Sequence, residues 1–358
     1  MKRRRGIVCL LFVVLAGLIV PTTSQASAAS TPVPERGIAI LFADDFPLAN
    51  LTPAQLAEKS RKTFTYVASV LHANAISLNF PFYMDTPSSP GLHSGMGTPT
   101  TAQLASVTRA AQARGLRVQY RPFLSEANFA TPGFDSAWRG TITPPSPAAW
   151  IAQYGAFLRP YFIQARKSGV TSFSIAAELN SLLNQLRPWQ AVVHSAQTLY
   201  GGTLIYSGTS IYQSIPKTSF GWDDYTPVTS ISYKGIPVSI NENSTAQQVS
   251  IGFKDNLQRN LLPSALASIR LEEVGIAGLN GAYAFPWAYY LSGTVNRAVQ
   301  ANWFTAACNA FFDFHMRGLY YWGLELEFFE PGTVAGDAFQ WYGTAGADAI
   351  AACYSRTS

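Results

Sequence analysis

Short apolar runs alternate with helix-like stretches along almost the whole chain. Eight runs have the length and the β-branched and aromatic content of buried strands, and most precede a stretch with helical spacing. These predicted strands cover residues 37–42, 75–80, 116–120, 171–175, 203–206, 230–233, 268–271 and 318–322. Strands separated by helices form parallel sheets with right-handed crossovers, and eight such units close on themselves. The sequence therefore predicts an α/β fold, a single (β/α)8 TIM barrel.

Local signals mark where the helices begin and where the loops are long. The pattern Thr-x-x-Gln, which predicts a capping box, occurs at residues 52–55, 100–103 and 245–248. Residues 85–101 and 131–147 are rich in Pro, Ser and Gly, and both stretches follow predicted strands. We expect extended βα loops on the catalytic side of the barrel, which lies at the carboxyl ends of the strands. Residues 211–227 are predicted to be mainly loop.

The first 28 residues have the three parts of an export signal. Residues 2–5 are basic, residues 7–20 are apolar, and Ala26-Ser27-Ala28 forms a small-residue cleavage site. We expect a mature, secreted domain of residues 29–358 that is not held at a membrane after cleavage. Four basic residues and no acids lie in positions 1–28, so the net charge falls from +5 to +1 without them. Such a charge argues against nucleic acid as a partner.

The cysteines and histidines limit the possible cofactors. Outside the export signal the chain has two cysteines, Cys308 and Cys353. In an oxidising compartment they could pair and join the last helix to the helix before it, or they could remain two buried thiols. The four histidines lack the spacing of metal-ligand motifs, so we expect no metal and no cofactor.

Two glutamates end predicted strands and are the candidates for chemistry. Glu178 follows the run 171–175, and Glu273 follows the run 268–271. Hydrolysis of a glycosidic bond needs one carboxylic acid and one carboxylate, and barrel enzymes take such groups from the carboxyl ends of different strands. Alternatively, both are exposed acids at strand ends. The rival carboxylates are expected on a solvated face: Glu126, Glu242, Glu325 and Glu327.

Glu272 directly precedes Glu273 within one predicted strand. Successive side chains of a strand point to opposite faces. We therefore expect only one of the two carboxylates to face the mouth of the barrel, and the sequence pattern around the strand favours Glu273.

Three segments carry a resemblance to a known family. They are Phe173-Ser-Ile-Ala-Ala-Glu178-Leu, then Glu272-Glu273-Val-Gly-Ile-Ala with the downstream Phe-Pro-Trp287, and Gly318-Leu-Tyr-Tyr-Trp322. In order and spacing they resemble the fourth, seventh and eighth strands of glycoside hydrolase family 113, the β-mannanase-like members of a clan of retaining barrel hydrolases. The resemblance implies that Glu178 is the acid/base and Glu273 the nucleophile.

The same resemblance suggests residues that support catalysis. Trp322 would lie beneath the sugar at the cleavage point and Trp287 would form a second wall, although either could be a core residue. Arg121 occupies the place of a family Lys, where it could bind hydroxyls, orient a carboxylate or form a structural ion pair. Asn180 and Tyr233 could replace two polar residues that the family pattern expects.

Two departures from the family pattern leave two functions open. Ala177 stands where the clan commonly has Asn, and Ser239 stands near the place of a Tyr that contacts the nucleophile. The first hypothesis is a secreted retaining glycosidase, a monomer that acts on a β-linked polysaccharide, with mannan favoured by the resemblance. The second is a barrel that binds polysaccharide or cell wall without cleaving it.

Overall fold

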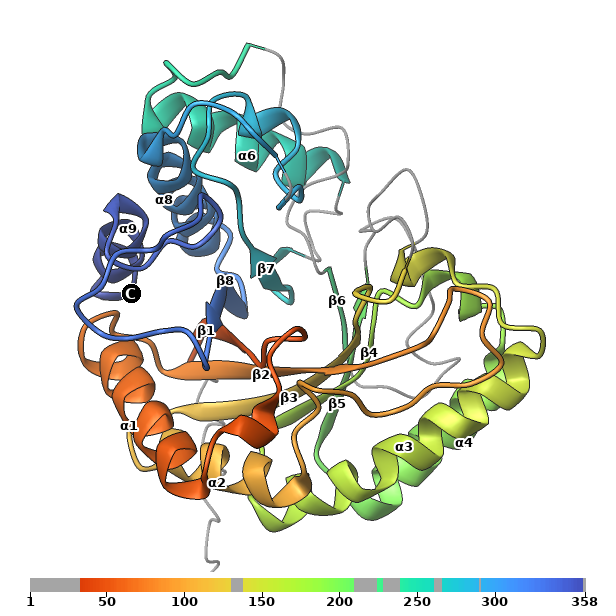
Figure 1. The fold of residues 1–358 in the computed structure, drawn as a ribbon. Helices are drawn as coiled ribbons and strands as arrows, with labels where there is room; N and C mark the ends of the chain where they lie inside the picture. Colours follow the sequence, from red (N-terminus) through yellow and green to blue (C-terminus); the bar gives the residue numbers. More distant parts are fainter. Residues whose placement is uncertain are drawn as a thin grey trace, which may run out of the picture. The chain divides into compact units, whose positions relative to one another are not determined.

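Eight parallel strands form one curled sheet, and helices lie along its outer side (Figure 1). The computed structural model describes residues 33–129, 138–208, 224–227, 239–260, 266–289 and 291–356. The strands are β1 (Glu35–Leu41), β2 (Ala75–Phe82), β3 (Arg117–Leu124), β4 (Ser172–Ala177), β5 (Thr203–Gly208), β6 (Asp224–Pro227), β7 (Arg270–Val274) and β8 (Gly318–Glu325). Their order is β6-β5-β4-β3-β2-β1-β8-β7, and β6 and β7 approach each other at the two ends. The predicted (β/α)8 barrel is confirmed.

The described helices are α1 (Pro53–Ser69), α2 (Thr101–Gln112), α3 (Pro147–Lys167), α4 (Leu186–Leu199), α6 (Ala246–Asn260), α8 (Arg297–Asp313) and α9 (Ala345–Tyr354). Three of them, α1, α2 and α6, begin where the capping signals placed them. Reciprocal side-chain and backbone bonds between Thr and Gln close a capping box at each of the three predicted places. No helix in the described part of the chain is long and apolar enough to cross a membrane.

The sixth strand differs from its prediction. The run 230–233 lies outside the described residues, whereas residues 224–227, which we expected to be loop, form β6. Asp224 and Pro227 are poor strand formers. The position of this strand is set instead by pairing with β5, in the register Ile205 to Asp224 and Gly208 to Pro227. Tertiary pairing therefore overrides local propensity in this segment.

The aromatic stripe of α3 packs against the sheet, as its helical spacing predicts. Trp150 and Tyr154 are fully buried, and the Tyr154 ring lies 5.0 Å from the ring of Phe82 on β2. The Tyr154 hydroxyl donates a hydrogen bond of 2.7 Å to the carbonyl of Ile175 on β4. These contacts hold α3 against β4, which is the strand that leads to Glu178.

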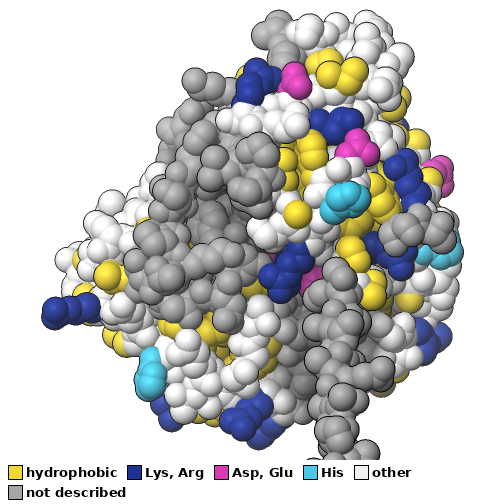
Figure 2. Space-filling model, turned by 180° about the vertical axis from the view of Figure 1, so that it is seen from behind, with side chains coloured by type: hydrophobic (Ala, Val, Ile, Leu, Met, Phe, Trp, Pro, Cys, Tyr) yellow, Lys and Arg dark blue, Asp and Glu magenta, His cyan; other side chains and the backbone are white. Residues whose placement is uncertain are grey.

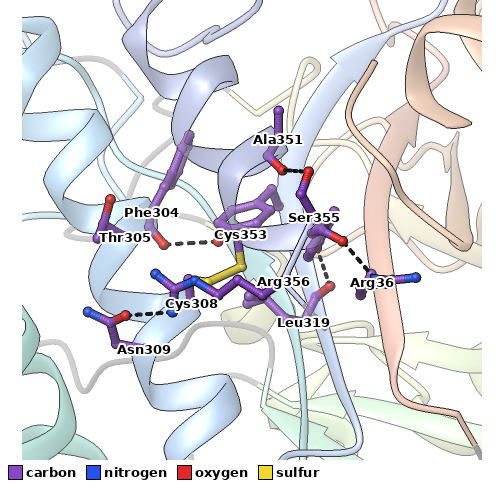
Figure 3. Close-up of a disulfide and its surroundings, with 12 residues drawn as sticks. Arg36, Phe304, Thr305, Cys308, Asn309, Leu319, Ala351, Cys353, Ser355 and Arg356 are labelled. Carbon is purple, nitrogen blue, oxygen red and sulfur yellow. Dashed lines mark hydrogen bonds between the residues drawn. A yellow bond between two sulfur atoms is a disulfide. The ribbon is translucent and has the colours of Figure 1, made fainter. Parts of the chain in front are cut away.

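Cys308 and Cys353 form a disulfide between α8 and α9 (Figure 3). Their Cα atoms are 5.8 Å apart, and both residues are buried. Near the bridge, Arg356 donates a hydrogen bond of 2.9 Å to the side chain of Asn309. Of the two possibilities that the sequence left open, the structure has the disulfide and not the pair of free thiols.

Removing this disulfide should lower the free energy of unfolding by about 3–4 kcal/mol, because the bridge restricts the unfolded chain across a loop of this size. The cysteines are 45 positions apart in the sequence. The measurement is urea denaturation of the double variant Cys308→Ala/Cys353→Ala against the oxidised protein. Wild type that has been fully reduced should unfold like the variant. Equal midpoints for oxidised protein and variant would contradict this expectation.

Candidate active site

Glu178 is the first residue after β4, and its backbone conformation is unusual. Its φ of 58° lies in the left-handed region, which costs a residue with a Cβ about 1–2 kcal/mol. The Glu178 amide donates to the Ser207 carbonyl on β5 (2.8 Å), and its carbonyl accepts from the Asn180 amide (2.8 Å). Strained residues of this kind collect at functional sites, where the surrounding structure holds them in place.

Glu272 and Glu273 lie on β7 at the point where the strand is irregular. Between Leu271 and Val274 the strand advances three residues, while β8 advances two, from Leu319 to Tyr321. The extra residue is a bulge, which interrupts the alternation of side chains. Both carboxylates consequently reach the same arginine, Arg121. The two side chains therefore do not point to opposite faces of the strand as expected, although Glu272 is fully buried and only Glu273, at 16%, is partly exposed.

Arg121 on β3 is the central cation of the site. Its side chain is 1% exposed, its Nη2 donates to Oε1 of Glu273, and its Nε lies 3.5 Å from Oε2 of Glu272. Nη1 donates to Oδ1 of Asn79 on β2 (2.8 Å), and the guanidinium lies over the ring of Trp322 at 5.6 Å. Arg121 thus forms ion pairs with both carboxylates, which fits two of the roles left open for it, orientation of a carboxylate and a structural ion pair. A guanidinium with this many fixed partners has little freedom to move.

Glu272 is fully buried and joins three strands inside the barrel. Its Oε1 accepts from Nε2 of Gln119 on β3 (2.8 Å), and its Oε2 accepts from the hydroxyl of Ser207 on β5. Ser207 also shares a hydrogen bond of 2.8 Å with Ser174 on β4. The sequence analysis missed this network. Its signal was polar residues at every second position of otherwise apolar strands, as at Ser77, Asn79 and Gln119.

A second arginine, also missed, contacts Glu178. Arg139 begins the short 3-10 helix η2 (Arg139–Thr141), and its Nε lies 3.6 Å from Oε2 of Glu178 and 2.9 Å from Oε1 of Glu126. The side chain of Glu126 is 11% exposed. Glu325 is half-buried, and Glu327 is 4% exposed. The expectation of a solvated face is therefore wrong for these three acids, because each lies at or just after the carboxyl end of β3 or β8 and is at least half-buried there.

The two candidate catalytic acids influence each other's protonation. Burial raises the pKa of Glu273 to about 7, the Arg121 guanidinium opposes this rise, and the negative charge of Glu178 adds to it. When two ionisable groups interact in this way, the observed pKa values describe the pair and not either residue alone. With a pKa of about 7, Glu273 is only partly ionised near neutral pH, and its ionisation depends on the charges of Arg121 and Glu178.

The remaining predicted site residues are placed as follows. Trp322 on β8 is partly buried beside Arg121, and its carbonyl accepts a hydrogen bond of 2.8 Å from Nε1 of Trp341. Trp287 is partly buried and packs edge-on against Phe285, with ring centroids 5.9 Å apart. Asn180 begins η3 (Asn180–Leu182), two residues after Glu178. Tyr233 lies outside the described residues.

The described residues hold no group of three or more His, Cys, Asp or Glu side chains that could bind a metal ion.

Glu327 should make the stability of the protein dependent on pH. Burial raises its pKa to about 7, its Oε2 accepts from the Ala43 amide (3.1 Å), and its Oε1 has no hydrogen-bond partner in the described part of the structure. Since the folded-state pKa lies above the ordinary 4.5, protonation favours folding. The stability from this group is complete below about pH 4.5 and is lost as the pH rises through about 7.

Glu327→Gln should therefore raise the free energy of unfolding by about 1–3 kcal/mol at pH 8 and change it little at pH 5. Thermal denaturation at both pH values measures the difference. Glu58→Gln, at an exposed site on α1, is the control and should not show such a pH-dependent gain. An equal effect of Glu327→Gln at both pH values would contradict the expectation.

A pair of interacting carboxylates at the carboxyl ends of the fourth and seventh strands of a (β/α)8 barrel is the arrangement of a glycoside hydrolase. The comparison with protein families agrees with this class. The model of Glycoside Hydrolase Family 113 matches residues 54–344. The chain belongs to this family, and its substrates are carbohydrates.

Solved structures share the fold at low sequence identity. The GH113 beta-mannanase AaManA from Alicyclobacillus acidocaldarius, in complex with ManMIm, is 19% identical with a TM-score of 0.69, over 90% of this chain and 97% of that one. A GH113 beta-1,4-mannanase is 15% identical with a TM-score of 0.72, over 90% and 99%. A beta-glucanase from Saccharophagus degradans, in complex with cellotetraose, is 12% identical with a TM-score of 0.54, over 90% and 88%. Among curated proteins, none matches this chain.

Proposed function

We propose that this glycoside hydrolase is a secreted β-mannanase that cleaves β-1,4-mannan with retention of configuration. The observation that carries the proposal is the placement of Glu178 directly after β4 and of Glu273 on β7, each beside an arginine. Mannan as the substrate is supported by the family and by the two mannanases that share its fold. On the described part of the face in Figure 2, Lys and Arg side chains are scattered among uncharged and apolar groups.

In the proposed first step, Glu273 attacks the anomeric carbon as a carboxylate. Its oxygen forms a bond to that carbon, the bond to the leaving oxygen breaks, and Glu178 gives its proton to that oxygen. In the second step Glu178, now a carboxylate, takes a proton from water, and the water oxygen replaces Glu273 at the anomeric carbon. Two displacements from opposite sides leave the configuration unchanged.

Arg121 prepares Glu273 for this attack. Its bond to Oε1 and the fixed position of its guanidinium leave the nucleophile one orientation. Glu272 also pairs with Arg121 and offsets part of its positive charge. The attraction between Arg121 and the carboxylate of Glu273 is therefore weaker than it would be with an unpaired arginine. We assign Trp322 to the floor beneath the reacting sugar, and Trp287, Asn180 and Tyr233 to further substrate contacts.

Secretion is supported by two independent features. Residues 1–28 have the composition of an export signal. The disulfide between α8 and α9 fits an oxidising compartment outside the cytoplasm. We further propose that the mature protein acts as a monomer.

The release of reducing sugar from mannan, glucan, xylan and galactan tests the proposal. We expect hydrolysis of mannan above the other polymers, and loss of this activity in Glu178→Gln and Glu273→Gln. If another polymer is hydrolysed, and both variants lose that activity, the proposed substrate would be wrong while the proposed mechanism would be supported. Binding without any hydrolysis would favour the non-catalytic barrel, for which Ala177 and Ser239 were the indications in the sequence.

A further inference from the structure

The side chain of Arg139 lies near Glu178, the acid that we assign to proton transfer. Its Nε is 3.6 Å from Oε2 of Glu178, which is too long for a hydrogen bond but short for an ion pair. Its hydrogen bonds go to Glu126 instead, at 2.9 Å from Nε and 3.1 Å from the backbone amide. The guanidinium is therefore placed to act on Glu178 through its charge.

The position of Arg139 is fixed from several sides. Besides the two bonds to Oε1 of Glu126, its guanidinium lies over the ring of the buried Phe123 at 5.3 Å. The segment that follows is tied to the loop after Glu178, because the Ser181 hydroxyl donates to the Ile142 carbonyl at 2.7 Å. A cation that is already in place needs no reorganisation when charge appears beside it.

The charge of Glu178 changes during the reaction. It is neutral before proton transfer and negative afterwards, so a nearby cation favours the state that forms as the leaving oxygen is protonated. The same cation also favours early loss of the proton from the free enzyme. The carboxylate of Glu126, whose Oε1 lies 2.9 Å from the same Nε of Arg139, offsets this effect. Among the described residues, the other charged groups around the pair are Arg121, Glu272 and Glu273.

We propose that Arg139 and Glu126 act as a positioning pair for Glu178: Arg139 stabilises the carboxylate that proton transfer creates, and Glu126 prevents the proton from leaving too early. The inference rests on the proposed function of Glu178 as acid/base. It assigns roles to Arg139, for which the sequence gave no indication, and to Glu126, which the sequence predicted on a solvated face. It also predicts that removing the two charges has opposite effects on one proton.

The test is a titration of the free enzyme that requires no substrate. Protein labelled with ¹³C at the glutamate carboxyl is followed by NMR, and the Glu178 signal is identified by its loss in Glu178→Gln. Arg139→Gln should raise the pH at which Glu178 ionises by about 1–3 units, since a cation within 4–6 Å lowers a carboxyl pKa by this amount. Glu126→Gln should lower that pH by roughly one unit or less.

Two further variants separate this role from a general structural one. Arg139→Lys keeps the charge and should titrate close to wild type. Glu35→Gln disrupts another Arg–Glu pair, Arg270 with Glu35 (2.6 Å), at the opposite end of the barrel strands. It should change thermal stability and leave the Glu178 titration where it is.

The activity profile provides the second arm of the experiment. The high-pH limb of kcat/KM on an aryl β-mannobioside should move up in Arg139→Gln and down in Glu126→Gln, as the titration does. Unchanged titrations, or shifts in the same direction in both variants, would overturn the inference. Shifted titrations in an enzyme that cleaves no mannoside would count against the proposed function and not against the effect of the pair on Glu178.

Discussion

Replacing Glu273 by alanine should reduce turnover of mannan by a factor on the order of 10⁴ to 10⁶, the loss typical of a missing nucleophile. Without this carboxylate no glycosyl-enzyme can form. The expected loss should be the same for substrates with good and poor leaving groups, because proton donation by Glu178 cannot replace the missing bond. Initial rates on mannan and on a dinitrophenyl β-mannobioside measure it. Glu242→Gln, which removes a partly exposed carboxylate outside the pair, is the matched control and should keep wild-type rates.

The effect of Glu178→Ala should depend on the leaving group. A dinitrophenolate leaves without a proton, so the glycosyl-enzyme should still form, whereas cleavage of mannan should fall by about 10²–10⁴. Azide needs no general base and should restore part of the turnover, with a β-mannosyl azide as product. If azide gives no acceleration, or if both variants lose activity equally on every substrate, the assignment of roles to the two glutamates is wrong.

Arg121→Met should damage both stability and catalysis. The substitution removes the cation from two buried carboxylates, Glu272 and Glu273, and breaking a buried pair in this way costs about 3–5 kcal/mol. Because Arg121 opposes the rise in the pKa of Glu273, its removal should raise that pKa further above about 7. The low-pH limb of kcat/KM should then move to higher pH, since Glu273 must be ionised to attack.

Arg121→Lys is the matched control that separates the effect of the positive charge from the effect of the guanidinium geometry. It keeps a cation near both carboxylates but loses the fork that also binds Asn79. We expect a smaller loss of stability and a smaller shift of the low-pH limb than in Arg121→Met. Urea denaturation and the pH profile measure the two effects. Equal pH profiles for wild type and Arg121→Met would show that Arg121 does not act on the nucleophile.

The barrel could be predicted from the sequence because the apolar residues of its strands and helices recur at regular spacings. Seven predicted strands overlap the observed ones, and Thr52, Thr100 and Thr245 each cap a helix where the local pattern placed it. The sixth strand could not be predicted, because residues 224–227 pair with β5 in spite of their poor strand propensity. Propensity describes single segments, whereas pairing depends on the neighbour that the fold provides.

The candidate site was predictable only in part. Glu178 and Glu273 could be selected because each ends an apolar run within a segment that resembles the family pattern. The joint contact of Glu272 and Glu273 with Arg121 depends on a bulge in β7 that has no signature in the local sequence. Arg139 lies in a loop rich in Pro, Ser and Gly, and its approach to Glu178 is set by Glu126 and Phe123. Such contacts follow from tertiary structure and not from sequence spacing.

The most direct test of the central claim is to trap the covalent intermediate. A 2-deoxy-2-fluoro-β-mannosyl fluoride has a good leaving group and slows both displacements, so that the glycosyl-enzyme accumulates. Mass spectrometry of the intact protein should find one added fluoromannosyl group, and peptide mapping should locate it on Glu273. Attachment to Glu272 or to any other residue, or turnover of the reagent without an adduct, would contradict the double-displacement mechanism proposed for Glu178 and Glu273.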